Sequence, residues 1–119
     1  MCGIIHNNIN LLEFLKVSTF EQVSVVIEAN VYFGGKVSSR TILFLDGSKK
    51  SLGILLPGEY HSNTSEPENM KIISGMAEYR LDENDDWKKV EQNGEFNVTG
   101  NSSFDIRALD VVDYCCSFL

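Results

Sequence analysis

Apolar and polar residues alternate along most of the chain. The alternation is clearest between residues 23 and 33, whose apolar members include Val23, Val25, Ile27, Ala29, Val31 and Phe33. A period of two residues places such side chains on one face of an extended strand. The pattern therefore predicts a half-buried strand over residues 23–33, which the Gly34-Gly35 pair ends.

Similar segments follow, separated by turn residues. Turn signals stand at Asp46-Gly47, Pro57-Gly58, Asn93-Gly94 and in the acidic run 82–86. The strands we expect between them span residues 40–45, 51–56, 72–81, 87–91, 96–98, 104–109 and 111–118. Short strands at this spacing are typical of a small sandwich or barrel, so the pattern predicts the all-β class.

The amino-terminal segment has a different period. Leu11, Phe14 and Leu15 stand at i, i+3 and i+4, and Asn8 precedes them as a possible N-cap. We expect residues 1–19 to form a short helical extension and residues 20–119 to form a single barrel domain.

Composition narrows the class of protein. The chain has 119 residues, and 10 Lys and Arg against 17 Asp and Glu give it a net charge of −7. An acidic domain of this size is a poor ligand for nucleic acid, and no apolar run is long enough to span a membrane. The amino terminus lacks the features of a signal peptide, so we expect a cytoplasmic protein.

We expect the adjacent Cys115 and Cys116 to be reduced and to face opposite sides of a terminal strand, one inward and one outward.

Most catalytic signatures are missing. The sequence has no G-x-S-x-G elbow and no glycine-rich phosphate loop, and its two histidines are His6 and His61. His61 lies near three glutamates, which is a weak metal signal, and we favour a solvated loop residue. The Met1-Cys2-Gly3 start is similar to that of amino-terminal-nucleophile amidotransferases, but those domains are far longer, and an ordinary cysteine is the simpler interpretation.

The most informative stretch runs from Gly58 to Gly75. Glu66 and Glu68 bracket Pro67 just before an apolar segment. These carboxylates are either exposed acids of a turn, or pocket groups that hold sugar hydroxyls or stabilise positive charge. The pattern alone leaves both interpretations open.

The spacing of Gly58, Glu68 and Gly75 resembles the first motif of the cupin superfamily, and Gly94 to Gly100 stands where the second motif would lie. Counting back from Glu68, the two metal histidines of that motif fall on residue pairs with at most one histidine, namely His61 with Asn63 or Ser62 with Thr64. The resemblance implies a cupin double-stranded β-helix, or jelly-roll barrel, that lacks the usual metal triad and has no cofactor.

Five blocks in order are similar to the small single-cupin family of pyrimidine/purine nucleoside phosphorylases. They are ANVYFGGKV (29–37), SLGILLPGEY (51–60), SEPENMKIISG (65–75), GEFNVTGNSSF (94–104) and VVDYCCSFL (111–119). This resemblance implies a pentosyltransferase of nucleoside salvage with broad specificity. Phosphate attacks C1′ of the ribose in purine and pyrimidine nucleosides, giving free base and α-D-ribose 1-phosphate.

The site residues that we expect follow from this resemblance. As catalytic residues we expect Glu66 and Glu68, for the ribose hydroxyls and the cationic sugar, and Tyr60, for stacking on the base or donating to phosphate. As substrate-binding residues we expect Lys50 as the first phosphate anchor and Lys36 as the second, and near the second motif Gly100, Asn101 and Ser102.

Two positions depart from the family pattern. Thr99 replaces a usual proline, and Asn101 stands where some members have a histidine. Since proline stiffens a turn, we expect its replacement by Thr99 to leave a looser pocket rim.

We also expect a homodimer that forms through the strand at residues 23–33. The alternatives are a metal-dependent small cupin and a non-enzymatic module that binds a nucleoside or a sugar.

Overall fold

The computed structural model describes residues 18–119, and the helix expected in residues 1–19 falls almost entirely outside them. The elements are β1 (Ser24–Val25), β2 (Asn30–Tyr32), the 3-10 turn η1 (Phe33–Gly35), β3 (Val37–Leu43), β4 (Lys49–Leu55), β5 (Gly58–Asn63), β6 (Glu68–Ser74), β7 (Met76–Arg80), β8 (Lys88–Glu91), β9 (Glu95–Val98), β10 (Ser103–Ala108) and β11 (Val112–Phe118). None of the helices in this part of the chain is long and apolar enough to cross a membrane.

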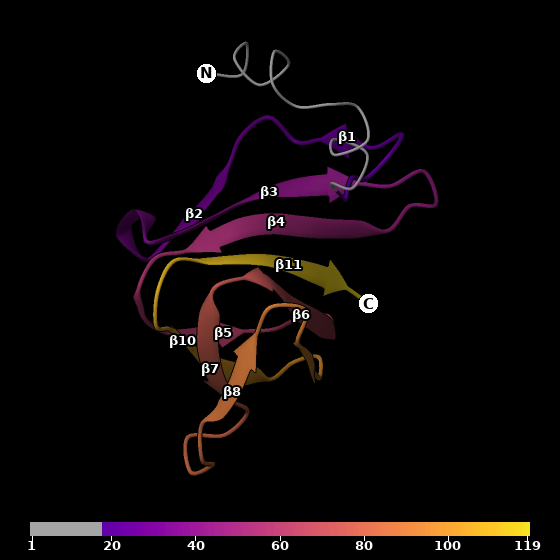
Figure 1. Cartoon of the computed structure of the whole chain (residues 1–119). Helices are drawn as coiled ribbons and strands as arrows, with labels where there is room; N and C mark the ends of the chain where they lie inside the picture. The colour runs from indigo at the N-terminus through magenta and orange to yellow at the C-terminus, as the bar shows by residue number, and fades with distance from the viewer. Residues whose placement is uncertain (1–17) are drawn as a thin grey trace, which may run out of the picture.

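The strands form two antiparallel sheets. The larger sheet has the order β1-β3-β4-β11-β6-β9, with β2 also paired to β3, and the smaller sheet has the order β5-β10-β7-β8. Figure 1 shows β3, β4 and β11 above the strands of the smaller sheet. From β4 onward the chain crosses repeatedly between the two sheets, which is the connectivity of a jelly roll. The structure therefore confirms the all-β, cupin-type fold.

The core lies between the two sheets and closes one end of the barrel. Ile72 of β6 and Val112 of β11 are fully buried there. Phe96 of β9 stacks on Tyr79 of β7 with ring centroids 3.8 Å apart, and it meets Phe104 of β10 edge to face at 5.7 Å. These contacts join the two sheets through apolar area removed from water.

The single strand expected over residues 23–33 is wrong. The chain forms two short strands there, and the intervening Ile27 is 89% exposed. Val25 pairs with Ile42, and Asn30 pairs with Ser39. The five residue steps from Val25 to Asn30 therefore lie opposite only three steps on β3. The extra residues loop out, and the Arg40 guanidinium holds the loop by donating to the Ile27 carbonyl. Alternation alone cannot reveal such an interruption.

Two further elements differ from the expectation. The strand β5 was not expected, because its sequence GEYHSN contains a single strongly apolar residue, Tyr60. The expected strand over residues 72–81 is in fact two strands in different sheets, and Gly75 separates them with φ +89°. The hairpin at Asp46-Gly47 is confirmed, since Phe44 and Ser48 close it with a backbone hydrogen bond of 3.0 Å.

The position of Gly75 generates a stability prediction. Gly75 and Gly47 share φ +89°, but a Cβ at Gly75 would lie 2.4 Å from the Val111 carbonyl oxygen, whereas one at Gly47 would have nothing within 4 Å. Gly75→Ala therefore adds a backbone clash to the cost of the left-handed conformation, which alone is about 1–3 kcal/mol. We expect Gly75→Ala to lower the free energy of urea unfolding clearly more than Gly47→Ala. Equal losses in the two variants would contradict this account of the β6–β7 crossing.

Candidate functional site

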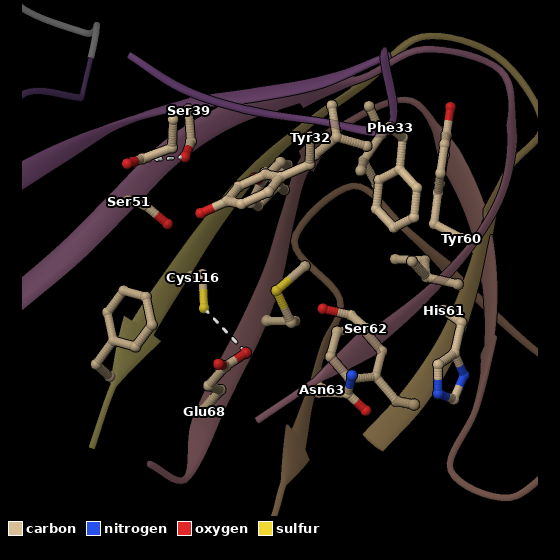
Figure 2. A pocket seen from close by; sticks show the side chains of 18 of the residues that line it. Tyr32, Phe33, Ser39, Ser51, Tyr60, His61, Ser62, Asn63, Glu68 and Cys116 are labelled. Atoms are coloured by element: carbon tan, nitrogen blue, oxygen red, sulfur yellow. Dashed lines mark hydrogen bonds between the residues drawn. The ribbon is translucent and has the colours of Figure 1, made fainter. Parts of the chain in front are cut away.

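A cavity of about 680 Å³ opens between the two sheets. Its walls come from β2, β3, β4, β5, β6, β10, β11 and η1 (Figure 2). The lining residues are Asn30, Tyr32, Phe33, Val37, Ser39, Thr41, Lys49, Ser51, Leu55, Tyr60, His61, Ser62, Asn63, Glu68, Met70, Phe104, Ile106, Tyr114, Cys116 and Phe118. The cavity brings together two of the expected catalytic residues, Tyr60 and Glu68.

Glu68 is the carboxylate of the cavity wall. It is the first residue of β6, and it pairs with Phe118 of β11. The Cys116 thiol donates a long hydrogen bond of 3.5 Å to Glu68 Oε1 (Figure 2). Burial raises the pKa of Glu68, and the neighbouring Glu66 raises it further, while the hydrogen bond from Cys116 opposes the shift. A partly desolvated carboxylate of this kind accepts hydrogen bonds from sugar hydroxyls and stabilises nearby positive charge.

The Cys116 thiol is a neutral donor in this pair. Burial and the adjacent Glu68 carboxylate both raise the pKa of Cys116 far above its ordinary value. Cys115, on the opposite face of β11, is also buried and is also a free thiol. The expectation that the two cysteines are reduced and face opposite sides of the strand is confirmed, and both side chains are buried.

Lys49 provides the cation at the mouth of the cavity. Its Nζ lies 5.0 Å from the ring centroid of Phe118 and 3.7 Å from Oε1 of Glu66. Glu66 itself is about half exposed and is not part of the cavity lining. The two expected carboxylates therefore occupy different environments, because Glu68 belongs to the wall and Glu66 contacts Lys49 from outside.

The wall formed by β3 and β4 carries hydroxyl groups. Ser39 and Thr41 of β3 and Ser51 of β4 face the cavity. The side-chain amide of Asn30 on β2 donates to Ser39 Oγ at 3.2 Å and to Thr41 Oγ1 at 3.1 Å. These hydroxyl groups are not among the site residues expected from the sequence. The one sequence feature that points to them is that Ser39 and Thr41 are two residues apart in a strand, so their side chains lie on the same face of the sheet.

Aromatic rings form another part of the wall. Phe33 packs on Tyr60 with ring centroids 5.0 Å apart, and Tyr32 extends into the cavity beside them (Figure 2). The Tyr60 hydroxyl donates to the Leu56 carbonyl at 2.5 Å, and burial raises its pKa. The ring of Tyr60 therefore lines the cavity, while its hydroxyl closes the turn between β4 and β5.

The two expected phosphate anchors lie outside the cavity lining. Lys50 is on the opposite face of β4 from Lys49, and its Nζ lies 5.5 Å and 5.7 Å from the ring centroids of Phe20 and Phe44. Lys36 follows η1, and its backbone bonds to Phe33 and Leu56. Lys50 lies outside the cavity because neighbouring residues of a strand point to opposite faces, and Lys49 points inward.

Gly100, Asn101 and Ser102 also lie outside the cavity lining, in the turn between β9 and β10. The Asn101 N–H donates to the Ser65 carbonyl at 3.1 Å, and the Ser102 N–H donates to Thr64 Oγ1 at 3.0 Å. Thr64 Oγ1 in turn donates to the Thr99 carbonyl at 2.7 Å. This turn therefore supports the segment that leads into Glu66 and Glu68.

His61 lies at the rim, and its ring is turned away from Glu68 (Figure 2). Its Nδ1 is 2.7 Å from Asp105 Oδ1, and Arg80 Nε donates to the other Asp105 oxygen at 2.9 Å. Both partners hold the pKa of Asp105 below its ordinary value. Within residues 18–119, no three or more His, Cys, Asp and Glu side chains form a group that could hold a metal ion.

Solved structures share the fold. A protein of unknown function from an Acinetobacter species superposes with a TM-score of 0.82 at 38% identity, over 85% of this chain and 98% of that one. A cupin superfamily protein from Desulfitobacterium hafniense superposes with a TM-score of 0.60 at 17% identity, over 78% of this chain and 83% of that one. The second likeness shows the cupin fold alone.

Sequence comparison identifies the family. A family model described as pyrimidine/purine nucleoside phosphorylase matches residues 27–118. A protein of that name from Sulfurimonas denitrificans is 53% identical over 84% of this chain and 96% of its own length. One from Geobacter sulfurreducens is 50% identical over 86% of this chain and 98% of its own length. The chain therefore belongs to the pyrimidine/purine nucleoside phosphorylase family.

Proposed function

We propose that the chain catalyses the phosphorolysis of nucleosides in the cavity between its two sheets. The observation that carries the proposal is that a single cavity presents a partly buried carboxylate, an ammonium group, hydroxyl donors and aromatic rings. These are the groups that a ribose, a phosphate and a nucleobase require. The volume of about 680 Å³ lies in the ordinary range for small-molecule sites. The names of the relatives support the same reaction.

The reaction needs no covalent intermediate with the protein. An oxygen of hydrogen phosphate forms a bond to C1′ of the ribose while the bond from C1′ to the base nitrogen breaks. The bonding electron pair leaves with the base, and the proton that the phosphate carried ends on that nitrogen. The products are free base and α-D-ribose 1-phosphate. Catalysis therefore depends on holding the reactants in line and on stabilising charge.

Glu68 is the residue that we assign to the sugar. Positive charge develops on the ribose as the glycosidic bond breaks, as it does in glycoside cleavage. The Glu68 carboxylate can accept a hydrogen bond from a ribose hydroxyl and offset that charge. Its partial burial strengthens the attraction, because solvent screens the interaction less. Glu66 acts through Lys49, whose ammonium group it holds at the mouth.

Broad specificity follows from the kind of contact available to the base. Tyr32, Phe33 and Phe118 offer rings on the cavity wall. Stacking on such rings is tolerant of base identity, because every base has a π face. If phosphate and ribose provide the specific contacts, purines and pyrimidines can share one site.

We also propose that two chains pair through the edge of the larger sheet. Val25, Ile27 and Val31, on and between β1 and β2, are 53%, 89% and 60% exposed. These strands are an edge of the sheet, where apolar side chains and free backbone groups favour association with a second strand. A symmetric dimer would cover this surface.

The function is tested by a phosphorolysis assay. Purified protein is incubated with uridine, cytidine, thymidine, adenosine, inosine and guanosine, with and without phosphate, and released base is measured by chromatography. We expect phosphate-dependent release from both purine and pyrimidine nucleosides. Binding of a nucleoside without any release of base would instead support a non-enzymatic binding module.

The role of Glu68 predicts a defined kinetic defect. We expect Glu68→Gln, which keeps the size of the side chain, to lower kcat/KM at least tenfold. Glu59→Gln on exposed β5 surface is the matched control and should have little effect. Because the carboxylate is the active form and its pKa is raised, the acid limb of the wild-type kcat/KM profile should lie above pH 4.5. A wild-type rate and pH profile in Glu68→Gln would remove Glu68 from the mechanism.

The dimer is tested by sedimentation velocity. At micromolar concentration we expect the wild-type protein to sediment as a dimer and Ile27→Asp to sediment as a folded monomer, since Ile27 makes little contact within its own chain. Leu109→Asp, at an exposed position between β10 and β11, is the control. A monomeric wild-type protein would refute this arrangement.

A further inference from the structure

The proposed phosphorolysis requires a place for the phosphate oxygens, and one wall of the cavity is rich in hydrogen-bond donors. Thr41 of β3 and Ser51 of β4 are direct partners across the two strands. Lys49 stands two residues before Ser51 on the same strand and therefore shares its face. Two hydroxyl groups and one ammonium group thus lie next to one another on the β3–β4 wall.

Asn30 determines what these hydroxyl groups can do. A side-chain amide nitrogen carries two hydrogens, and in Asn30 one is donated to Ser39 Oγ and the other to Thr41 Oγ1. Each hydroxyl oxygen therefore acts as an acceptor toward Asn30, and its own proton must point elsewhere. No side-chain hydrogen bond among residues 18–119 has the Thr41 hydroxyl as its donor, and Thr41 lines the cavity, so its proton is available to a ligand there.

Charge and spacing favour an anion at this wall. Lys49 is the only lysine or arginine among the described residues that line the cavity. Glu68 is two strands away, on β6 beyond β11. Neighbouring strands lie about 4.8 Å apart, so roughly 10 Å separates the backbones of Lys49 and Glu68. An anion bound by Lys49 is therefore kept away from the Glu68 carboxylate, with Phe118 of β11 in the row between them.

We infer that the Thr41 and Ser51 hydroxyls and the Lys49 ammonium form the phosphate subsite of this cavity, and that Asn30 is a positioning residue that turns the Thr41 proton toward the bound anion. The inference rests on the proposed function for its biological meaning. Its physical content, an oxyanion site on the β3–β4 wall, stands independently of turnover. Lys49 lies 3.7 Å from Glu66 Oε1, and its three N–H donors allow it to bind phosphate while it keeps this contact.

Inorganic phosphate is the probe for the test, with its affinity measured by isothermal titration calorimetry in a phosphate-free buffer. We expect Asn30→Asp to weaken phosphate binding at least tenfold, because a carboxylate accepts the Thr41 proton and repels the anion. Thr41→Val should weaken binding severalfold, and Thr41→Ser should restore it because the hydroxyl returns. Lys49→Met should abolish measurable binding. Lys71→Met is the matched control, since Lys71 is an exposed lysine of β6 outside the cavity lining.

Kinetics separate this inference from a general loss of structure. In Asn30→Asp and Thr41→Val we expect the KM for phosphate to rise at least severalfold while the KM for the nucleoside changes less than twofold. Circular dichroism establishes that each variant is folded. If Asn30→Asp does not fold, the comparison of Thr41→Val with Thr41→Ser decides the question.

The outcomes distinguish the two proposals. Phosphate binding that depends on Asn30, Thr41 and Lys49, without phosphorolysis of any nucleoside, would uphold the subsite and reject the proposed function. Phosphorolysis with an unchanged phosphate KM in Asn30→Asp and Thr41→Val would uphold the function and overturn the subsite. No binding of phosphate to the wild-type protein at millimolar concentration would also overturn the subsite.

Discussion

The register between β4, β11 and β6 is the constraint on which the site depends. Ser51 pairs with Cys116 and Cys116 with Met70, while Phe118 pairs with Glu68, so these inward side chains form rows across the larger sheet. A shift of one residue in any of these strands would turn its whole row to the other face. The same alternation that buries the core therefore decides which polar groups reach the cavity.

Along these strands the inner face changes from apolar to polar. At the closed end, Leu55 pairs with Val112, and both are buried. At the mouth, Lys49 and Glu68 flank Phe118. The apolar end contributes to the stability of the barrel. At the mouth, burial of Glu68 raises the pKa of its carboxyl, and weaker solvent screening makes this single carboxylate more effective toward a cationic sugar.

Much of the fold could be predicted from the sequence. Alternation located most strands, and the spacing of Glu68 and Gly75 indicated the cupin fold and one residue of the cavity wall. The assignment of Lys50 as a phosphate anchor shows the limit, because period two gives opposite faces to Lys49 and Lys50 but does not say which face is inside. The hydroxyl wall could not be found either, since Asn30 reaches Ser39 and Thr41 only through the pairing of β2 with β3. The loop at Ile27 could not be predicted either, because the alternation of apolar and polar residues continues through it although the strand does not.

The site is tested most directly by a crystal structure of the protein with ribose 1-phosphate and hypoxanthine bound. We expect the phosphate to lie against the β3–β4 wall, with its oxygens within hydrogen-bond distance of Lys49, Thr41 and Ser51. We expect a sugar hydroxyl to donate a hydrogen bond to the Glu68 carboxylate. Density for the ligand outside the cavity, for example on the face of β4 that carries Lys50, would show that this cavity is not the site of phosphorolysis.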